Sequence, residues 1–161
     1  MFDKYNVGGT PWAVFNGNPL KRVLGNNADQ YQKRITDVQN EQASSQVSLQ
    51  GEVINTVNML GASVAIENFS DIQLSGATLS VVFFERIRFT QDGLMHNVVR
   101  GVADRDADGK EITISNLDVG ASASFLVQSK LPYSSYNGNY GMVILLKDAK
   151  TGYIIQAFLA E

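Results

Sequence analysis

The chain has 161 residues, a net charge of −3 and no cysteine. This length suits one domain of ordinary size with or without an appendage, and 44% hydrophobic residues can build a core, which excludes general disorder. The acidic balance argues against a nucleic-acid partner, which needs a basic surface. The lack of cysteine excludes disulfides, thiolate metal sites and dithiol redox chemistry within the chain. The chain has no run of roughly 18 apolar residues, so no transmembrane helix is predicted. The N-terminus shows no signal-peptide pattern.

The first part of the chain predicts a β-hairpin. Residues 11–15 form a short apolar run that ends at Asn16 and Gly17, a pair that tolerates the positive φ of a tight hairpin turn. Residues 19–24 supply the returning strand.

A helix is predicted over 28–42. Asn27 stands at the N-cap position, where its side chain would accept hydrogen bonds from early backbone N–H groups. The apolar residues recur at helical spacing along one stripe: Tyr31, Ile35 and Val38. Two strands and one helix bury too little apolar surface to fold alone, so this segment is expected to be part of a domain.

From about residue 44 the sequence is rich in Val, Ile, Phe, Ser and Thr, with turn signals at short intervals. Strands are predicted over 46–55, 61–69, 77–89, 94–104, 110–116, 121–130, 140–148 and 152–160. Leu79, Val81 and Phe83 alternate with Thr78 and Ser80, which predicts a sheet with one face towards a core and the other towards water. We therefore predict a mainly β fold, an immunoglobulin-like antiparallel β-sandwich, and favour it over the alternative of a barrel.

Two runs, 142–146 and 153–159, are almost wholly apolar. Such runs suit central strands that are buried on both faces, or strands that face a neighbouring domain.

Acidic residues alternate once in the chain, at Asp104, Asp106 and Asp108 ahead of Gly109. This spacing resembles the opening of a calcium loop, in which alternate carboxylates around a glycine-relieved turn bring their oxygens to one hard cation. The position that would carry the closing glutamate is Ser115, and the alternative is a solvated hairpin tip. We therefore expect no cofactor, with calcium at this turn as the open alternative.

A second candidate is the loop that holds Tyr133, Tyr136 and Tyr140 among Ser, Asn and Gly. Tyrosines in such a setting are typical of adaptable partner-binding loops, and the alternative is an ordinary connection that caps the sandwich. His96 is the single histidine, and no Gly-x-Ser-x-Gly pattern accompanies it. No catalytic site is predicted and the chain is expected not to be an enzyme; a hydrolase built on His96 is kept as a hypothesis.

Two other patterns favour structural interpretations. Neighbouring predicted strands carry Arg86, Arg88 and Arg100. We expect these side chains to form ion pairs at the surface with acidic residues such as Glu85. Asn68 opens an Asn-Phe-Ser glycosylation pattern, which we treat as a chance match.

The segment 5–25, with the pair Thr10-Pro11 ahead of an apolar strand, a glycine-containing turn, a second strand and a helix, resembles the second half of a thioredoxin-like domain. This resemblance implies that Pro11 is the cis-proline of that fold and Thr10 the residue before it. The first half of such a domain, with its Cys-x-x-Cys, has no counterpart in the chain, so redox chemistry is not expected.

Residues 46–161 resemble the β-sandwich that follows the thioredoxin-like unit in secreted or envelope proteins related to the Omp28 outer-membrane family. The segments that carry this resemblance are His96–Arg100, Asn116–Gly120 and Gly152–Ala157. The resemblance implies a periplasmic, secreted or cell-envelope location.

These observations predict two units, a partial thioredoxin-like ββα segment over 1–43 and a β-sandwich domain over 44–161. The expected function is a non-catalytic interaction or structural module of an extracytoplasmic thioredoxin-like protein. The apolar residues of 1–43 need a cover, which packing on the sandwich or a swapped homodimer would supply. We expect a protein partner or a homodimer to bind through this segment. The alternative is a calcium- or ligand-binding module of adhesion type.

Overall fold

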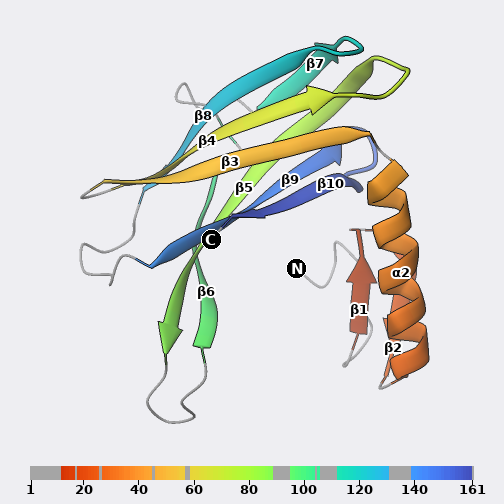
Figure 1. The fold of residues 1–161 in the computed structure, drawn as a ribbon. Coiled ribbons are helices and arrows are strands. Elements are labelled where there is room, and N and C mark those ends of the chain that lie inside the picture. Colours follow the sequence, from red (N-terminus) through yellow and green to blue (C-terminus); the bar gives the residue numbers. More distant parts are fainter. Residues whose placement is uncertain are drawn as a thin grey trace.

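The computed structural model describes residues 12–16, 18–25, 27–44, 46–56, 59–88, 95–103, 105, 112–130 and 139–160. Within these ranges it holds one helix, α2 (Ala28–Ser44), and ten strands (Figure 1). The strands are β1 (Trp12–Phe15), β2 (Asn18–Leu24), β3 (Val47–Thr56), β4 (Met59–Asn68), β5 (Leu74–Arg88), β6 (Met95–Ala103), β7 (Thr113–Leu117), β8 (Ser122–Lys130), β9 (Tyr140–Asp148) and β10 (Ile154–Ala160). Every predicted strand has a counterpart, with ends that differ by a few residues.

Two antiparallel sheets form the body of the molecule. The larger has the order β10-β9-β5-β6, with β7 paired to the beginning of β5, and the smaller has the order β3-β4-β8. The sheets lie face to face, with β3 beside β10 and β6 beside β8 (Figure 1). Neither sheet closes on itself, so the fold is the predicted β-sandwich and the barrel alternative is wrong.

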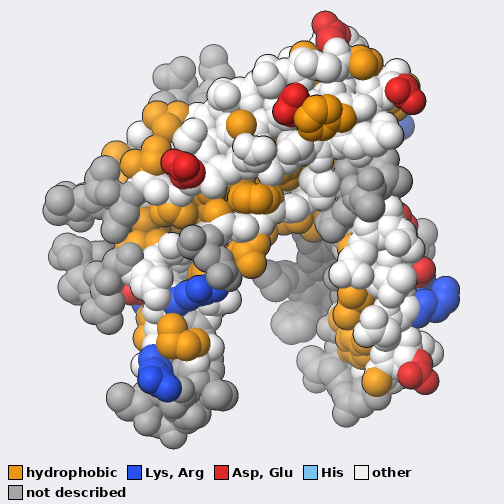
Figure 2. All heavy atoms as spheres, in the orientation of Figure 1, with side chains coloured by type: hydrophobic (Ala, Val, Ile, Leu, Met, Phe, Trp, Pro, Cys, Tyr) orange, Lys and Arg blue, Asp and Glu red, His pale blue; other side chains and the backbone are white. Residues whose placement is uncertain are grey.

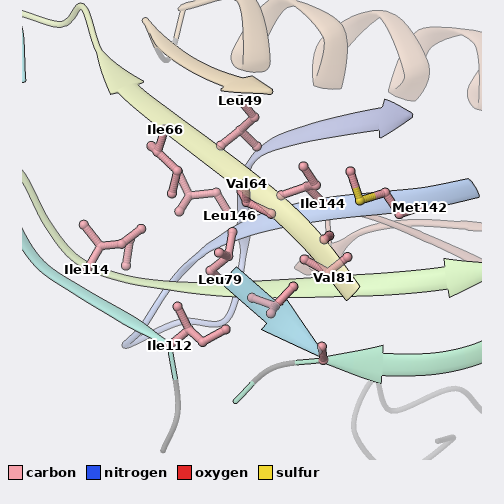
Figure 3. Close-up of a cluster of buried hydrophobic side chains, with 14 of the residues drawn as sticks. Leu49, Val64, Ile66, Leu79, Val81, Ile112, Ile114, Met142, Ile144 and Leu146 are labelled. Atoms are coloured by element: carbon pink, nitrogen blue, oxygen red, sulfur yellow. The ribbon is translucent and has the colours of Figure 1, made fainter. Parts of the chain in front are cut away.

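The core between the sheets comes from alternate residues of the strands. Leu79, Val81 and Phe83 of β5 are buried, as their period of two predicts. They pack with aliphatic side chains of both sheets (Figure 3): Leu49, Val64, Ile66, Ile114, Met142, Ile144 and Leu146. β3 comes close to β9 at Gly51, where a Cβ would lie 2.7 Å from Ile144 Cδ1. Only glycine permits this approach, because a methyl group there would overlap the core.

The side of β5 turned away from the core is only partly exposed, whereas the alternation argument predicts a face in water. Ser80 and Phe84 point to that side, yet both are buried. Lys147 Nζ donates a hydrogen bond to Ser80 Oγ over 2.7 Å, so the hydroxyl is satisfied. The ring of Phe84 lies against Gly141, where a Cβ would overlap it. We call this side of the larger sheet the outer face.

The apolar run 142–146 forms β9, which lies between β5 and β10 and so is central, as predicted. The run 153–159 contributes β10, which lies at the edge of the larger sheet, so its interpretation as a central strand is wrong. Two of its N–H groups have partners outside the ladder: Ile154 N donates to Asn16 O, and Ala157 N to Gln156 Oε1. These bonds partly protect an edge that has no charged side chain.

The N-terminal hairpin and helix form as predicted and pack beside β10 (Figure 1). Asn16 has a φ of 52°, which is the left-handed turn conformation expected of it. Asn27 Oδ1 accepts the N–H of Gln30 over 3.0 Å, which confirms the N-cap. Phe15 and Tyr31 meet edge to face at 6.1 Å and join strand to helix. We call β1, β2 and α2 together the N-terminal unit.

Asn68 is a buried polar residue that joins three parts of the sandwich. Its Nδ2 donates to Ile72 O and Leu117 O over 2.9 and 3.0 Å, and its Oδ1 accepts the N–H of Ser70 over 3.0 Å. The side chain thus ties the end of β4 to the β4–β5 connection and to the end of β7. Because it is 0% exposed and both ends of the amide are occupied, its glycosylation pattern is inaccessible in the folded chain.

We expect Asn68→Leu to destabilise the fold by about 2–4 kcal/mol, because the buried bond to Leu117 O and the part-buried bonds to Ile72 O and Ser70 N are lost. Urea unfolding followed by circular dichroism measures this. The matched control is Asn116→Leu on the exposed part of β7, which should change stability by less than about 0.5 kcal/mol. Equal stability of the two variants would show that the amide does not hold these segments together.

Candidate functional site

Most of the site residues suggested by the sequence lie outside the described residues. They are Thr10, Pro11, Asp104, Asp106, Asp108, Tyr133 and Tyr136. The cis-proline, calcium and partner-loop predictions at these positions therefore stay predictions. Tyr140 is described: it begins β9 and packs half-buried against the core. That packing agrees with the alternative in which tyrosine caps the sandwich.

The part of the chain that the structure describes holds no cluster that could form a metal centre. Within it, no three Asp, Glu or His residues come together in a way that could hold a metal ion. His96 lies in β6, where its backbone pairs with Ile87 of β5. The side chain of His96 is not among the described ones, so the hydrolase hypothesis stays a prediction.

One ion pair of the described residues joins the buried Glu85 to Arg100, whose side chain is 18% exposed. Glu85 follows Phe83 on the core side of β5 and is 1% exposed. Nε and Nη2 of Arg100 each lie 2.8 Å from Glu85 Oε2. Two charge-assisted hydrogen bonds to one carboxylate oxygen offset part of the cost of burying both charges.

A β-bulge in β6 places Arg100 in this position. Phe83 pairs with Gly101 and Phe84 pairs with Val99, so Arg100 is the extra residue between them. Beside it, a Cβ on Gly101 would overlap Ser129 of β8, so the two sheets meet closely here. The prediction that Arg100 pairs with Glu85 is confirmed, but the pair lies inside the sandwich and not on its surface.

A cavity of about 580 Å³ lies where the β4–β5 connection meets the ends of β3 and β9. Apolar Val47, Leu74 and Ile155 line it together with the carboxylates Asp71 and Asp148. Its polar lining also includes Ser70, whose Oγ donates a hydrogen bond to Asn68 Oδ1 over 2.6 Å. The cavity has the volume of a small ligand site.

Asp148 is held in the turn that joins β9 to β10. Its Oδ1 accepts hydrogen bonds from Thr151 Oγ1 and Thr151 N, each over 2.7 Å. These two bonds, the side-chain one first, lower the pKa of Asp148 below its usual value. Its carboxylate is therefore ionised at neutral pH and stabilises the turn through these hydrogen bonds.

The N-terminal unit has an apolar stripe that is incompletely covered. Tyr31 meets Phe15, and Val38 is half-buried, but Ile35 on the same stripe is 41% exposed. Arg34 and Asp37 form an ion pair over 3.3 Å beside this stripe. Within the described residues β1 and β2 pair only with each other, so the outer edges of the hairpin have no strand partner there. This unit is the candidate interaction site.

Comparison with solved structures shows the same fold in a bacterial protein. HBP35 of Porphyromonas gingivalis matches with a TM-score of 0.59 and 11% identity, over 98% of this chain and 54% of that chain. This likeness shows the fold, and it includes the N-terminal unit. The chain spans about half the length of HBP35.

A domain of the outer membrane lipoprotein Omp28 from Porphyromonas gingivalis matches with a TM-score of 0.48 and 12% identity, over 72% of this chain and 87% of that one. Neither protein-family models nor curated proteins give a match to this chain. Across the described residues, no helix is both long enough and apolar enough to pass through a membrane.

We expect Glu85→Gln to destabilise the chain by about 1.5–3 kcal/mol, because the charge-assisted bonds between Arg100 and the buried carboxylate are lost. Urea unfolding measures the effect. The double variant Glu85→Leu/Arg100→Leu is the control, and it should recover much of the loss because no buried charge remains. If the double variant loses the sum of the two single changes, the ion pair does not couple these residues.

Thr151→Val removes the first cause of the lowered pKa of Asp148. A carboxyl whose pKa is lowered on folding stabilises the fold above its unfolded pKa of about 3.9, and loses that contribution as the pH falls through the lowered folded value. We therefore expect wild type to melt above Thr151→Val at pH 7, with the difference shrinking below pH ~4. A difference that is constant from pH 7 to pH ~2 would show that Asp148 does not contribute through its charge.

Proposed function

We propose that this chain is a non-catalytic interaction module of an extracytoplasmic, envelope-associated protein with a thioredoxin-like part, and that it binds a protein partner or a second copy through its N-terminal unit. The observation that carries the proposal is the partly covered apolar stripe of α2, on which Ile35 is 41% exposed. An apolar surface on an element this small favours association, because the element cannot bury it alone.

The polar groups of the sandwich support a non-catalytic role. Glu85 is bonded to Arg100, Asn68 to backbone groups, and Asp148 to Thr151. Each of these groups holds strands or turns in place. A catalytic acid or base would instead face a substrate site beside a second reactive group.

The envelope location rests on the resemblance of the sandwich to Omp28-related proteins. The structural match to HBP35 extends over almost the whole chain. It therefore supports the arrangement in which hairpin and helix pack on the sandwich. The attachment is specific in this chain too, since Asn16 O accepts the N–H of Ile154 at the beginning of β10 over 3.0 Å. The N-terminal unit is thus presented beside the sandwich edge in a defined position.

Light scattering during gel filtration tests the homodimer form of the proposal. We expect a mass of two chains that returns to one chain in Ile35→Glu, because a charge in an apolar contact is costly to bury. The matched control is Ile72→Glu in the exposed β4–β5 connection, which should leave the mass unchanged. A monomeric wild type would exclude the homodimer.

Hydrogen exchange then separates the remaining cases. If the chain is a monomer and the amides of 12–44 exchange fast, a different protein partner is favoured. Fast exchange would mean that the backbone hydrogen bonds of this unit open while its apolar side is uncovered. Protection of 12–44 equal to that of the sandwich would show that the unit is already satisfied, and the proposal would fail. A rise in melting temperature with added calcium would favour the adhesion-type alternative.

A further inference from the structure

The cavity of about 580 Å³ is formed by three segments at one end of the sandwich. They are the junction of α2 with β3, the connection from β4 to β5, and the turn from β9 to β10. Figure 2 shows acidic side chains in red at the end of the sandwich where β4 joins β5. Sites for small ligands have volumes of about 300–1,000 Å³, so this cavity is large enough to hold one.

Hydrogen bonds between the three segments fix the walls of the cavity. Phe69 N donates to Gln46 O over 2.8 Å and joins the β4–β5 connection to the residue before β3. Ala149 N donates to Gly76 O over 2.7 Å and joins the β9–β10 turn to β5. A ligand that enters a cavity with fixed walls orders little of the chain, so the cost of binding is low.

The cavity combines a buried apolar part with polar groups. Val47 is 6% exposed, and Leu74 and Ile155 pack against the core. The polar lining residues are Gln46, Ser70, Asp71, Gln73, Ser75 and Asp148. A wholly apolar ligand would remove water from these groups without replacing its hydrogen bonds, which is costly. The lining therefore favours a ligand with an aliphatic part and a polar part.

Both charged residues of the lining are acidic, and none of the described lining residues is Lys or Arg. Asp71 is exposed, and Asp148 accepts both of its bonds from Thr151 on Oδ1. A carboxylate has about four acceptor positions on its two oxygens, so Asp148 can accept a further donor. The exposed Lys150 of the same turn is the last of the causes that lower the pKa of Asp148, after the bonds to Thr151.

The end of α2 adds to the negative character of the cavity. This helix ends at Ser44, close to Gln46 of the lining, and has no basic side chain in its last turn. The C-terminus of a helix carries about half a negative charge. A phosphate or carboxylate ligand is therefore disfavoured and a cationic group is favoured. A metal ion is not indicated, because no third acidic or histidine side chain joins Asp71 and Asp148 among the described residues.

We propose that this cavity binds a short cationic segment of another protein. A lysine or arginine of that segment lies near Asp71 and Asp148, and an aliphatic neighbour covers Val47, Leu74 and Ile155. Lysine and arginine suit both parts of the cavity, because the methylene stem packs on apolar surface while the head carries the charge. The apolar stripe of α2 takes no part in this contact, so either proposal can fail without the other.

The probe is a blocked pentapeptide, Gly-Val-Lys-Val-Gly, titrated into the isotope-labelled full chain and followed by NMR. We expect amide shifts confined to residues 46–47, 70–75 and 148–155. The same peptide with norleucine in place of lysine keeps the shape without the charge, and it should bind about fivefold more weakly. Equal binding of the two peptides overturns the proposal. So does an absence of shifts at about 5 mM lysine peptide, which fills most sites even at a Kd of about 1 mM.

Variants of the lining test the charge and the place of binding. Asp71→Asn/Asp148→Asn should weaken binding about tenfold, because asparagine keeps the acceptor for Thr151 and loses only the charge. Asp71→Asn alone should weaken it about threefold and serves if the double variant does not fold. The matched control is Glu52→Gln, an exposed acid of β3 outside the cavity, which should bind as wild type does.

Filling the cavity gives a test that does not depend on charge. Ser75→Tyr puts a ring into the space on an exposed position of β5, and it should abolish the shifts while circular dichroism shows an intact fold. Wild-type binding by this variant would place the peptide elsewhere and overturn the proposal.

Two further titrations identify competing ligands. Pentylamine should bind more weakly than the lysine peptide, because it lacks the aliphatic neighbour, and calcium chloride alone should not shift the lining residues. Binding of pentylamine as tight as that of the peptide would assign the cavity to a free amine. Shifts of the lining residues with calcium alone would assign it to a metal ion, and either result overturns the peptide assignment.

Discussion

The whole structure depends on the close contact of two sheets through their aliphatic inner faces. Each fully buried Val, Leu or Ile contributes about 1.5–3 kcal/mol, and the inner residues of β3, β4, β5 and β9 supply many of them. Gly51 lets β3 approach Ile144 and Met142 of β9, and Gly101 lets β6 approach Ser129 of β8. Because the two sheets pack closely at these contacts, a polar group between them must form its hydrogen bonds with other protein groups.

That constraint explains why the notable polar residues are structural. Glu85 and Asn68 lie inside the sandwich and are bonded there to Arg100 and to backbone carbonyls. The N-terminal unit and the lower parts of β5 and β6 project from the same side of the sandwich (Figure 1).

Glu85 and Arg100 show where reasoning from the sequence stops. Alternation along β5 places Glu85 on the same side as Phe83, yet a glutamate is expected at the surface, so a surface pair was predicted. The bulge that brings Arg100 to it is a shift in the pairing of β6 with β5, which no local pattern reveals. Ser80 was predicted on a wet face for a similar reason, since its partner Lys147 lies far along the chain.

The sequence alone determined the helix after Asn27, the turn at Asn16 and the approximate limits of every strand, because caps, turns and hydrophobic periods act between near neighbours in the chain. The predicted sites at Asp104 and Pro11 lie outside the described residues and stay predictions. Only the tertiary structure decided that β10 is an edge strand, that Asn68 is buried and that Ser80 and Phe84 are buried on the outer face of the larger sheet. Those properties depend on which distant segments pair and stack, and long-range packing is not encoded in any local pattern.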